Sequence, residues 1–128
     1  MKGNRSEKVL VIGYGSMGKR HVRNLLDLGV TPYVITRHPD DIGAVFCEDI
    51  YPCKGIPIRH CIISSITGRH LDDLRKCVRF LKDIKNILIE KPLEATCKKA
   101  KEIERLARAR NLDIRVAYNL RFLRVFEK

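Results

Sequence analysis

Three closely spaced glycines after the first apolar run constrain the fold of this chain more than any other feature. The run, residues 9–12, is rich in β-branched side chains and does not alternate with polar ones, which is typical of a parallel strand buried on both faces. Gly13, Gly15 and Gly18 follow it directly. Beyond them, apolar residues recur at helical spacing as far as Gly29, a residue that can end a helix. We therefore expect a strand, a tight turn and a helix.

Strand and helix patterns alternate along the rest of the chain. Short apolar runs predict strands at residues 33–36, 44–47, 61–65, 86–89 and 114–118. Helical stripes lie at Leu71, Leu74, Val78 and Leu81, and again at Ala100, Ile103, Leu106 and Ala107. Thr67 and Thr96 are the expected N-caps of these two helices, and Asn111 is the expected left-handed end of the second. The alternation predicts an α/β fold, a doubly wound parallel sheet of the Rossmann type in a single domain.

Residues 38–59 interrupt this alternation. Prolines and glycines occur there at Pro39, Gly43, Pro52, Gly55 and Pro57, too often for a helix of ordinary length. Between the second predicted strand and the strand at 61–65 we therefore expect only the short strand at 44–47.

The composition of the 128-residue chain is that of a soluble globular protein, 45% hydrophobic and 32% charged. No apolar run approaches the roughly 18 residues that a membrane span needs, and the polar N-terminus, MKGNRSEK, lacks the features of a secretory signal. The five cysteines include no close CxxC pair, which favours reduced thiols over disulfides or a metal site. We expect a cytoplasmic protein that binds no metal and no membrane.

The formal net charge of +11 indicates attraction to phosphates, nucleic acid or an acidic partner. Half of the 26 basic residues lie between Arg69 and Arg110, where seven acids accompany them, so a solvated helix surface is the favoured interpretation. No zinc-finger spacing or aromatic RNA-binding motif accompanies the charge, so nucleic acid is not an expected partner.

The spacing GxGxxG, placed between a strand and a helix, is typical of a dinucleotide-binding loop. Gly13 permits the tight turn, Gly15 lets the backbone approach a pyrophosphate, and Gly18 lets the helix pack closely on the sheet. The first N–H groups of the helix then face the phosphates with the positive end of the helix dipole. The alternative is a glycine turn without a ligand. The expected contacts are Gly13, Tyr14, Gly15, Ser16, Met17 and Gly18.

The end of the second predicted strand indicates which dinucleotide binds. An acid there would bind the ribose 2′-hydroxyl of NAD, but the sequence has Thr36-Arg37-His38. The guanidinium of Arg37 suits a 2′-phosphate in charge and geometry, which favours NADP over NAD. Two alternatives stay open: Arg37 could stack on adenine or lie free on the surface, and Asp40 or Asp41 could curl back toward the site.

Four segments occur in an informative order. They are VIGYGSMGKRH at 11–21, SSITGRH at 64–70, Glu90-Lys91-Pro92 directly after the fifth predicted strand, and YNLRF at 118–122. Together they resemble the Gfo/Idh/MocA oxidoreductases, a family named for glucose-fructose oxidoreductase and inositol dehydrogenase. The tripeptide Glu90-Lys91-Pro92 is weak evidence by itself. Its position directly after a predicted parallel strand, in line with the other three segments, argues against coincidence.

This resemblance implies hydride transfer between NAD(P) and a hydroxyl or carbonyl group on a sugar, cyclitol or related compound. Lys91 matches the family's catalytic lysine, and the end of a parallel strand is where such a residue would face the ligand crevice. An exposed or ion-paired lysine is the alternative. The resemblance also implies cofactor contacts at Ser65, His70 and Glu90, although His70 could equally cap or pack a helix start. It places Asn119 and Arg121 near the nicotinamide or substrate.

The family continues with a second α/β domain that supplies the substrate pocket, and here residues 119–128 match only its start. The expectation is an oxidoreductase part with little or no activity by itself. A non-catalytic NAD(P)-sensing module is the alternative, but such a module has no need of Glu90-Lys91-Pro92. A nucleic-acid-binding redox repressor is a weaker hypothesis because no recognition helix is apparent. Apolar residues around Leu120 to Phe126 would permit a homodimer.

Overall fold

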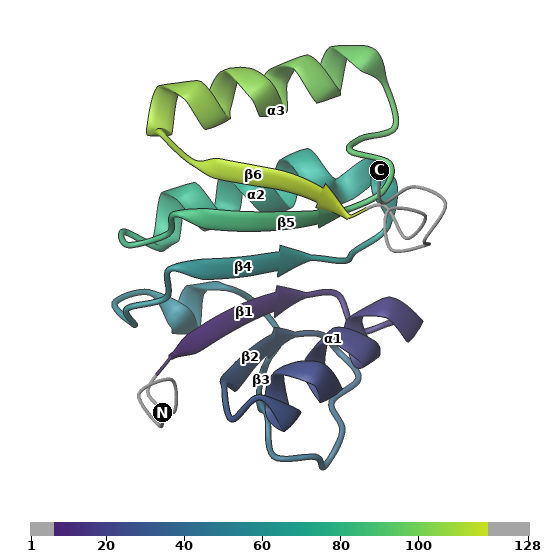
Figure 1. The fold of residues 1–128 in the computed structure, drawn as a ribbon, viewed down its shortest axis with the longest axis vertical. Coiled ribbons are helices and arrows are strands. Elements are labelled where there is room, and N and C mark those ends of the chain that lie inside the picture. Colours follow the sequence, from purple (N-terminus) through teal and green to yellow (C-terminus); the bar gives the residue numbers. More distant parts are fainter. Residues whose placement is uncertain (1–6, 118–128) are drawn as a thin grey trace, which may run out of the picture.

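The structure is a computed structural model that describes residues 7–117. Its six strands are all parallel and form one sheet in the order β3-β2-β1-β4-β5-β6 (Figure 1). The strands are β1 Lys8–Ile12, β2 Thr31–Ile35, β3 Val45–Cys47, β4 His60–Ile63, β5 Asn86–Glu90 and β6 Asp113–Ala117. The predicted parallel α/β sheet is confirmed, with each predicted strand present to within two residues at either end.

Three α-helices and two short 3₁₀ turns connect the strands. They are α1 Ser16–Asp27, η2 Tyr51–Cys53, η3 Thr67–Arg69, α2 His70–Phe80 and α3 Cys97–Arg110. From β1 the chain crosses to β2 in one direction, and from β4 it crosses to β5 and β6 in the other. Right-handed crossovers therefore place α1 on one face of the sheet and α2 and α3 on the opposite face (Figure 1).

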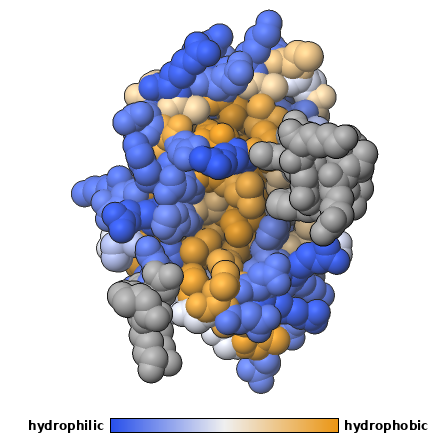
Figure 2. Space-filling model, in the orientation of Figure 1, coloured by the Kyte–Doolittle hydropathy of each residue, from blue (hydrophilic) through white to orange (hydrophobic). Residues whose placement is uncertain are grey.

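The larger core lies between the sheet and the pair α2 and α3. Leu74 of α2 and Ile103 of α3 pack there with Leu10 of β1, and all three are almost fully buried. On the other face, Val22 of α1 packs with Val11 and a smaller group of side chains. Among the described residues α1 is the only helix on that face, and Figure 2 shows an apolar area over the middle of the sheet there.

The proline- and glycine-rich segment behaves as its sequence indicates. It contains β3 and the turn η2 but no α-helix. Its apolar residues nevertheless complete the larger core, because Ile50, Cys53 and Ile58 are each at most 2% exposed. No helix among residues 7–117 is long and apolar enough to cross a membrane.

Local signals at helix ends are mostly confirmed. Thr96 Oγ1 accepts the N–H of Lys99 at 3.2 Å at the start of α3, and Asn111 ends that helix in the left-handed region with φ of 54°. Gly29, with φ of +78°, follows the end of α1.

The cap predicted at Thr67 is wrong. Thr67 opens the turn η3 instead, and α2 begins at His70 without a side-chain cap from its own N-terminal flank. Glu94, from the loop after β5, takes over this role, because its Oε2 accepts the N–H of Leu71 at 2.9 Å. A buried carboxylate satisfies a first-turn donor more strongly than a neutral hydroxyl, since the bond is charge-assisted.

Candidate functional site

A crevice of about 850 Å³ opens at the carboxyl ends of the strands, where the chain leaves β1 in one direction and β4 in the other. Open parallel sheets bind ligands at such a switch point, because the diverging loops leave room between them. Five segments line it: Ile12–Gly15 at the end of β1, Ile35–His38 at the end of β2, Glu48–Ile50 after β3, Ser64–Ile66 after β4, and Arg69, Asp73 and Lys76 from the N-cap and first two turns of α2.

Two of the three motif glycines are required by the packing of the chain itself. A Cβ on Gly13 would lie 2.7 Å from the Ser64 carbonyl carbon and from the Ser65 nitrogen, and φ at Gly13 is +99°. A Cβ on Gly18 would collide with the Gly13 carbonyl oxygen. The strand, turn and helix therefore lie too close together for any larger residue at either position.

Gly15 differs from the other two glycines. A Cβ there would meet nothing within 4 Å, and its φ of −80° is one that any residue adopts. Nothing in the described chain therefore demands a glycine at this position. The space it leaves open lies in the wall of the crevice, directly before the first residue of α1.

The turn that carries Gly15 is held by bonds from both neighbouring strands. Ser64 Oγ lies 3.1 Å from the carbonyl oxygens of Ile12 and of Gly13, which share its one proton, and the Gly13 N–H donates to Ile35 O at 3.1 Å. No side chain in the described part of the chain caps the start of α1, and the first turn of this helix contains no acid. The N–H groups of Ser16 and Met17 therefore lie at a positive helix end without a side-chain partner.

Arg37 lies on the wall formed by the segment after β2, where its side chain is exposed. Asp40 curls back from the same loop, and the Tyr14 hydroxyl donates to its Oδ2 at 3.3 Å. Burial raises the pKa of Tyr14, and the charge and hydrogen bond of Asp40 raise it further. Tyr14 also packs edge-on against Phe46 at 5.3 Å between ring centroids, which fixes the ring beside the glycine turn.

The same crevice is also lined by acids and cations that the sequence analysis does not predict. Glu48 and Asp49 follow β3, and Arg69, Asp73 and Lys76 come from the N-cap and first two turns of α2. The positions of Glu48 and Asp49 can be predicted from the sequence, because ligands lie beyond the carboxyl ends of parallel strands and residues 44–47 are a predicted strand. Burial raises the pKa of Asp73, which also accepts a short hydrogen bond from Ser65 Oγ.

His70 lies beneath the crevice and does not line it, because its side chain is only 1% exposed. Its Nδ1 is 3.0 Å from Leu93 O and its Nε2 is 2.9 Å from Ser65 O. Both partners are backbone carbonyl oxygens, one on each side of the ring. His70 thereby joins the turn after β4 to the loop after β5, while Ser65 itself reaches the crevice wall.

Glu90 and Lys91 lie at the end of β5, on the same edge of the sheet as the glycine turn, but outside the crevice wall. Glu90 is only 8% exposed, and its Oε2 lies 2.6 Å from Nε2 of His21 on α1. Lys91 is exposed. Asn119 and Arg121 lie outside the described residues, as does the apolar segment 120–126.

Residues 7–117 contain no group of three or more histidine, cysteine, aspartate or glutamate side chains that could hold a metal ion. The five cysteines are all free thiols, and Cys61 Sγ lies 3.6 Å from Cys77 Sγ in the buried core.

No family model matches the sequence. Solved structures do resemble the fold. The protein yvaA of Bacillus subtilis, assigned as an oxidoreductase, has a TM-score of 0.78 at 22% identity, and a protein of Thermotoga maritima assigned as a dehydrogenase has 0.79 at 20%. Each match covers 94% of this chain.

A third structure, the WlbA dehydrogenase of Chromobacterium violaceum in complex with NADH and UDP-GlcNAcA, has a TM-score of 0.77 at 16% identity and covers 96% of this chain. This chain spans only 37% to 38% of the length of these three neighbours. At such identities the likeness establishes the Rossmann-like fold, and the three neighbours are oxidoreductases by their descriptions.

Proposed function

We propose that this chain is the dinucleotide-binding part of an NAD(P)-dependent oxidoreductase. The observation that carries the proposal is the contrast among the glycines. Gly13 and Gly18 are required by the packing of the chain, whereas no contact within residues 7–117 requires a glycine at position 15. A glycine that only a ligand requires, beside an uncapped helix start in a crevice, fits a pyrophosphate. The NADH complex of the neighbour WlbA supports this choice of ligand.

The residues present fit such a cofactor. The N–H groups of Ser16 and Met17 would hold the pyrophosphate, and the side-chain-free face of Gly15 would admit it. Arg37 would pair with a 2′-phosphate, so we propose NADP as the preferred form. Glu48 and Asp49 lie in the same wall and would oppose an added phosphate charge, so the ratio of the affinities for NADPH and NADH measures which of the two effects is larger.

The nicotinamide ring of the bound cofactor supplies hydride chemistry. This chain's part in the reaction is a proton transfer, in which Lys91 Nζ accepts the proton of a substrate hydroxyl or returns it to a carbonyl oxygen. Lys91 directly follows β5, on the same edge of the sheet as the glycine turn, so it would meet a substrate bound beside the crevice. Glu90, which His21 holds, would fix the backbone from which Lys91 projects.

We propose a sugar, cyclitol or similar hydroxyl compound as the substrate, with Asn119 and Arg121 beside it. The UDP-GlcNAcA bound by WlbA supports a sugar-like substrate. The binding surface for it would come from further chain, in keeping with the 37% to 38% of the neighbours' length that this sequence spans. The apolar area in Figure 2 is a surface that such chain would cover. With five free thiols, we propose a cytoplasmic location.

Calorimetric titration of the full chain with NADPH and with NADH tests the proposal. We expect binding with a Kd in the micromolar range, roughly −8 kcal/mol. Gly15→Val should abolish it without unfolding the chain, because its side chain enters open space. Gly68→Val is the matched control, since Gly68 also has nothing within 4 Å of its Cβ and an ordinary φ, yet lies outside the crevice wall. No heat with either cofactor, or equal binding by both variants, would refute the proposal.

A further inference from the structure

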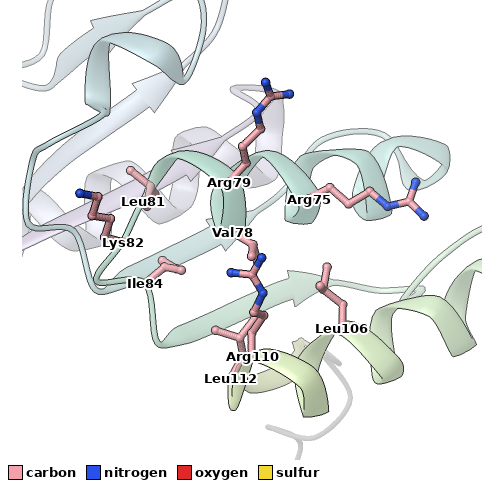
Figure 3. A pocket seen from close by; sticks show the side chains of 9 residues that line it. All are labelled: Arg75, Val78, Arg79, Leu81, Lys82, Ile84, Leu106, Arg110 and Leu112. Atoms are coloured by element: carbon pink, nitrogen blue, oxygen red, sulfur yellow. The ribbon is translucent and has the colours of Figure 1, made fainter.

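A second hollow, of about 620 Å³, lies between the ends of α2 and α3 (Figure 3). Both helices run antiparallel to the strands, so their C-terminal ends lie at the sheet edge opposite the glycine crevice. Ile84 and Leu112, which line the hollow, lie within two residues of the first residues of β5 and β6. The two sites share no lining residue.

The floor of this hollow is apolar. It is formed by Val78 of α2, Leu106 of α3 and the loop residues Leu81, Ile84 and Leu112. Leu81 and Ile84 are buried, and the other three are half-buried and partly open to the hollow. An occupant with an apolar body would remove the remaining apolar surface from water.

The rim is formed by four cations, and none of the described residues that line the hollow is an acid. They are Arg75, Arg79, Lys82 and Arg110. Arg75 is paired, with Glu102 at 3.9 Å and Asp72 at 3.8 Å, and Arg79 lies over the Phe80 ring at 5.2 Å.

Lys82 and Arg110 form no ion pair with any residue in the described range 7–117. Figure 3 shows Arg110 extending from the end of α3 toward Val78, across the opening. The unpaired charge of Arg110 therefore lies beside the apolar floor.

The helix dipoles account for only part of this charge. A helix C-terminus is equivalent to about half a negative charge, so the ends of α2 and α3 together offset roughly one cation. Arg75 is compensated by its ion pairs with Asp72 and Glu102. Arg79, Lys82 and Arg110 remain as the cations to be compensated. About two positive charges are therefore left without compensation around one hollow, and their mutual repulsion favours a bound anion.

We propose that this hollow is a binding site for a small organic anion with an apolar body. The acidic head pairs with Arg110, which extends across the opening (Figure 3), and the body lies on Val78, Leu106 and Leu112. The volume falls within the range of roughly 300–1,000 Å³ that small-molecule sites occupy. A nucleic-acid backbone would use the cations but not the apolar floor. The site is independent of the dinucleotide crevice and of the proposed oxidoreductase function.

Amide chemical-shift mapping of the full ¹⁵N-labelled chain tests this site with three probes. Octanoate has both head and body, 1-octanol has the body alone, and acetate has the head alone. We expect octanoate to shift the amides around Val78, Leu106 and Leu112 and to bind at least tenfold more tightly than either other probe. Equal affinity for octanol, or shifts confined to the glycine crevice, would overturn the proposal. So would binding to anionic lipid vesicles without any response to free octanoate.

Two charge reversals on α3 sharpen the test. Arg110→Glu should weaken octanoate binding by about tenfold, because an attractive charge beside the head becomes repulsive. Arg108→Glu is the matched control, being equally exposed, in the same last turn, and outside the lining of the hollow. Equal losses of octanoate affinity in both variants would show that the effect comes from general surface charge, and would contradict the proposed site.

Discussion

His21 Nε2 lies 2.6 Å from Glu90 Oε2, although the two residues are 69 positions apart in the sequence. Their side chains are only 17% and 11% exposed, so the contact is largely shielded from water. His21 belongs to the helix that begins at the glycine turn, and Glu90 directly precedes Lys91. The pair therefore ties the proposed pyrophosphate loop to the strand end that carries the proposed proton-transfer residue.

Removal of His21 should destabilise the fold, because Glu90 would then be a nearly buried carboxylate without its partner. We expect His21→Ala to lower the free energy of unfolding by about 2 kcal/mol, within the range for an unsatisfied buried polar group. Urea unfolding measures it. Glu90→Gln should cost less, since its amide still bonds to the imidazole.

A double-mutant cycle with His21→Ala and Glu90→Ala isolates the pair. We expect a coupling free energy of roughly 1 kcal/mol or more between the two sites. Strictly additive losses would mean that the two side chains are stabilised by other neighbours and that the 2.6 Å contact contributes nothing of its own.

The glycines should separate by their effect on stability. Gly18→Ala places a methyl group against the Gly13 carbonyl oxygen, which belongs to the backbone and cannot rotate away. We expect a loss of about 3 kcal/mol in the free energy of unfolding, at the upper end for overpacking. Thermal melts should show almost no change for Gly15→Ala or Gly68→Ala, where a Cβ meets nothing within 4 Å. A stable Gly18→Ala chain would contradict the packing argument.

The sequence predicted the parts of this fold that depend on neighbouring residues. Buried strands, the glycine turn, the Thr96 cap and the left-handed Asn111 each have a local signal, and the structure contains all of them. The Thr67 cap failed because the competing group, Glu94, is more than twenty residues away along the chain. Propensity alone cannot rank a local hydroxyl against a distant carboxylate.

The candidate site likewise has residues that the sequence predicted and contacts that it could not predict. Gly13, Gly15, Arg37 and Ser65 were predicted and all line the crevice. His70 was expected beside the cofactor from the resemblance, and its burial beneath the wall depends on two carbonyl oxygens that no sequence pattern specifies. The contact between His21 and Glu90 is equally unpredictable, because α1 and β5 meet only once the sheet order is known.

Cofactor selectivity should depend on Arg37. Arg37→Asp should weaken NADPH binding by about tenfold, the loss of one charge-assisted contact of roughly 1.5 kcal/mol, and leave NADH affinity unchanged or improved. Fluorescence titration of both nucleotides gives the ratio. Arg59→Asp is the control, because Arg59 is exposed and lies outside the crevice wall. If the wild-type chain prefers NADH, the 2′-phosphate role of Arg37 is wrong.

The Glu94 cap should give stability a defined pH dependence. Burial by itself would raise the pKa of Glu94, but the N–H groups of Ala95 and Leu71, with the charges of Lys99 and His70, hold this pKa below its ordinary value of 4.5. A carboxyl whose pKa is lower in the folded chain than in the unfolded chain contributes stability above the unfolded pKa. That contribution is lost as the pH falls through the folded pKa.

Glu94→Gln should therefore cost about 1–2 kcal/mol of unfolding free energy at pH 7, the usual worth of a helix cap with a charge at the positive helix end. The difference in unfolding free energy between wild type and variant should narrow as the pH falls below 4.5, the ordinary pKa of a glutamate, because protonated Glu94 and glutamine are then nearly equivalent. Urea unfolding at a series of pH values measures it, with the exposed Glu104→Gln as control. A gap that stays constant into strong acid would mean that Glu94 stabilises α2 by shape and not by charge.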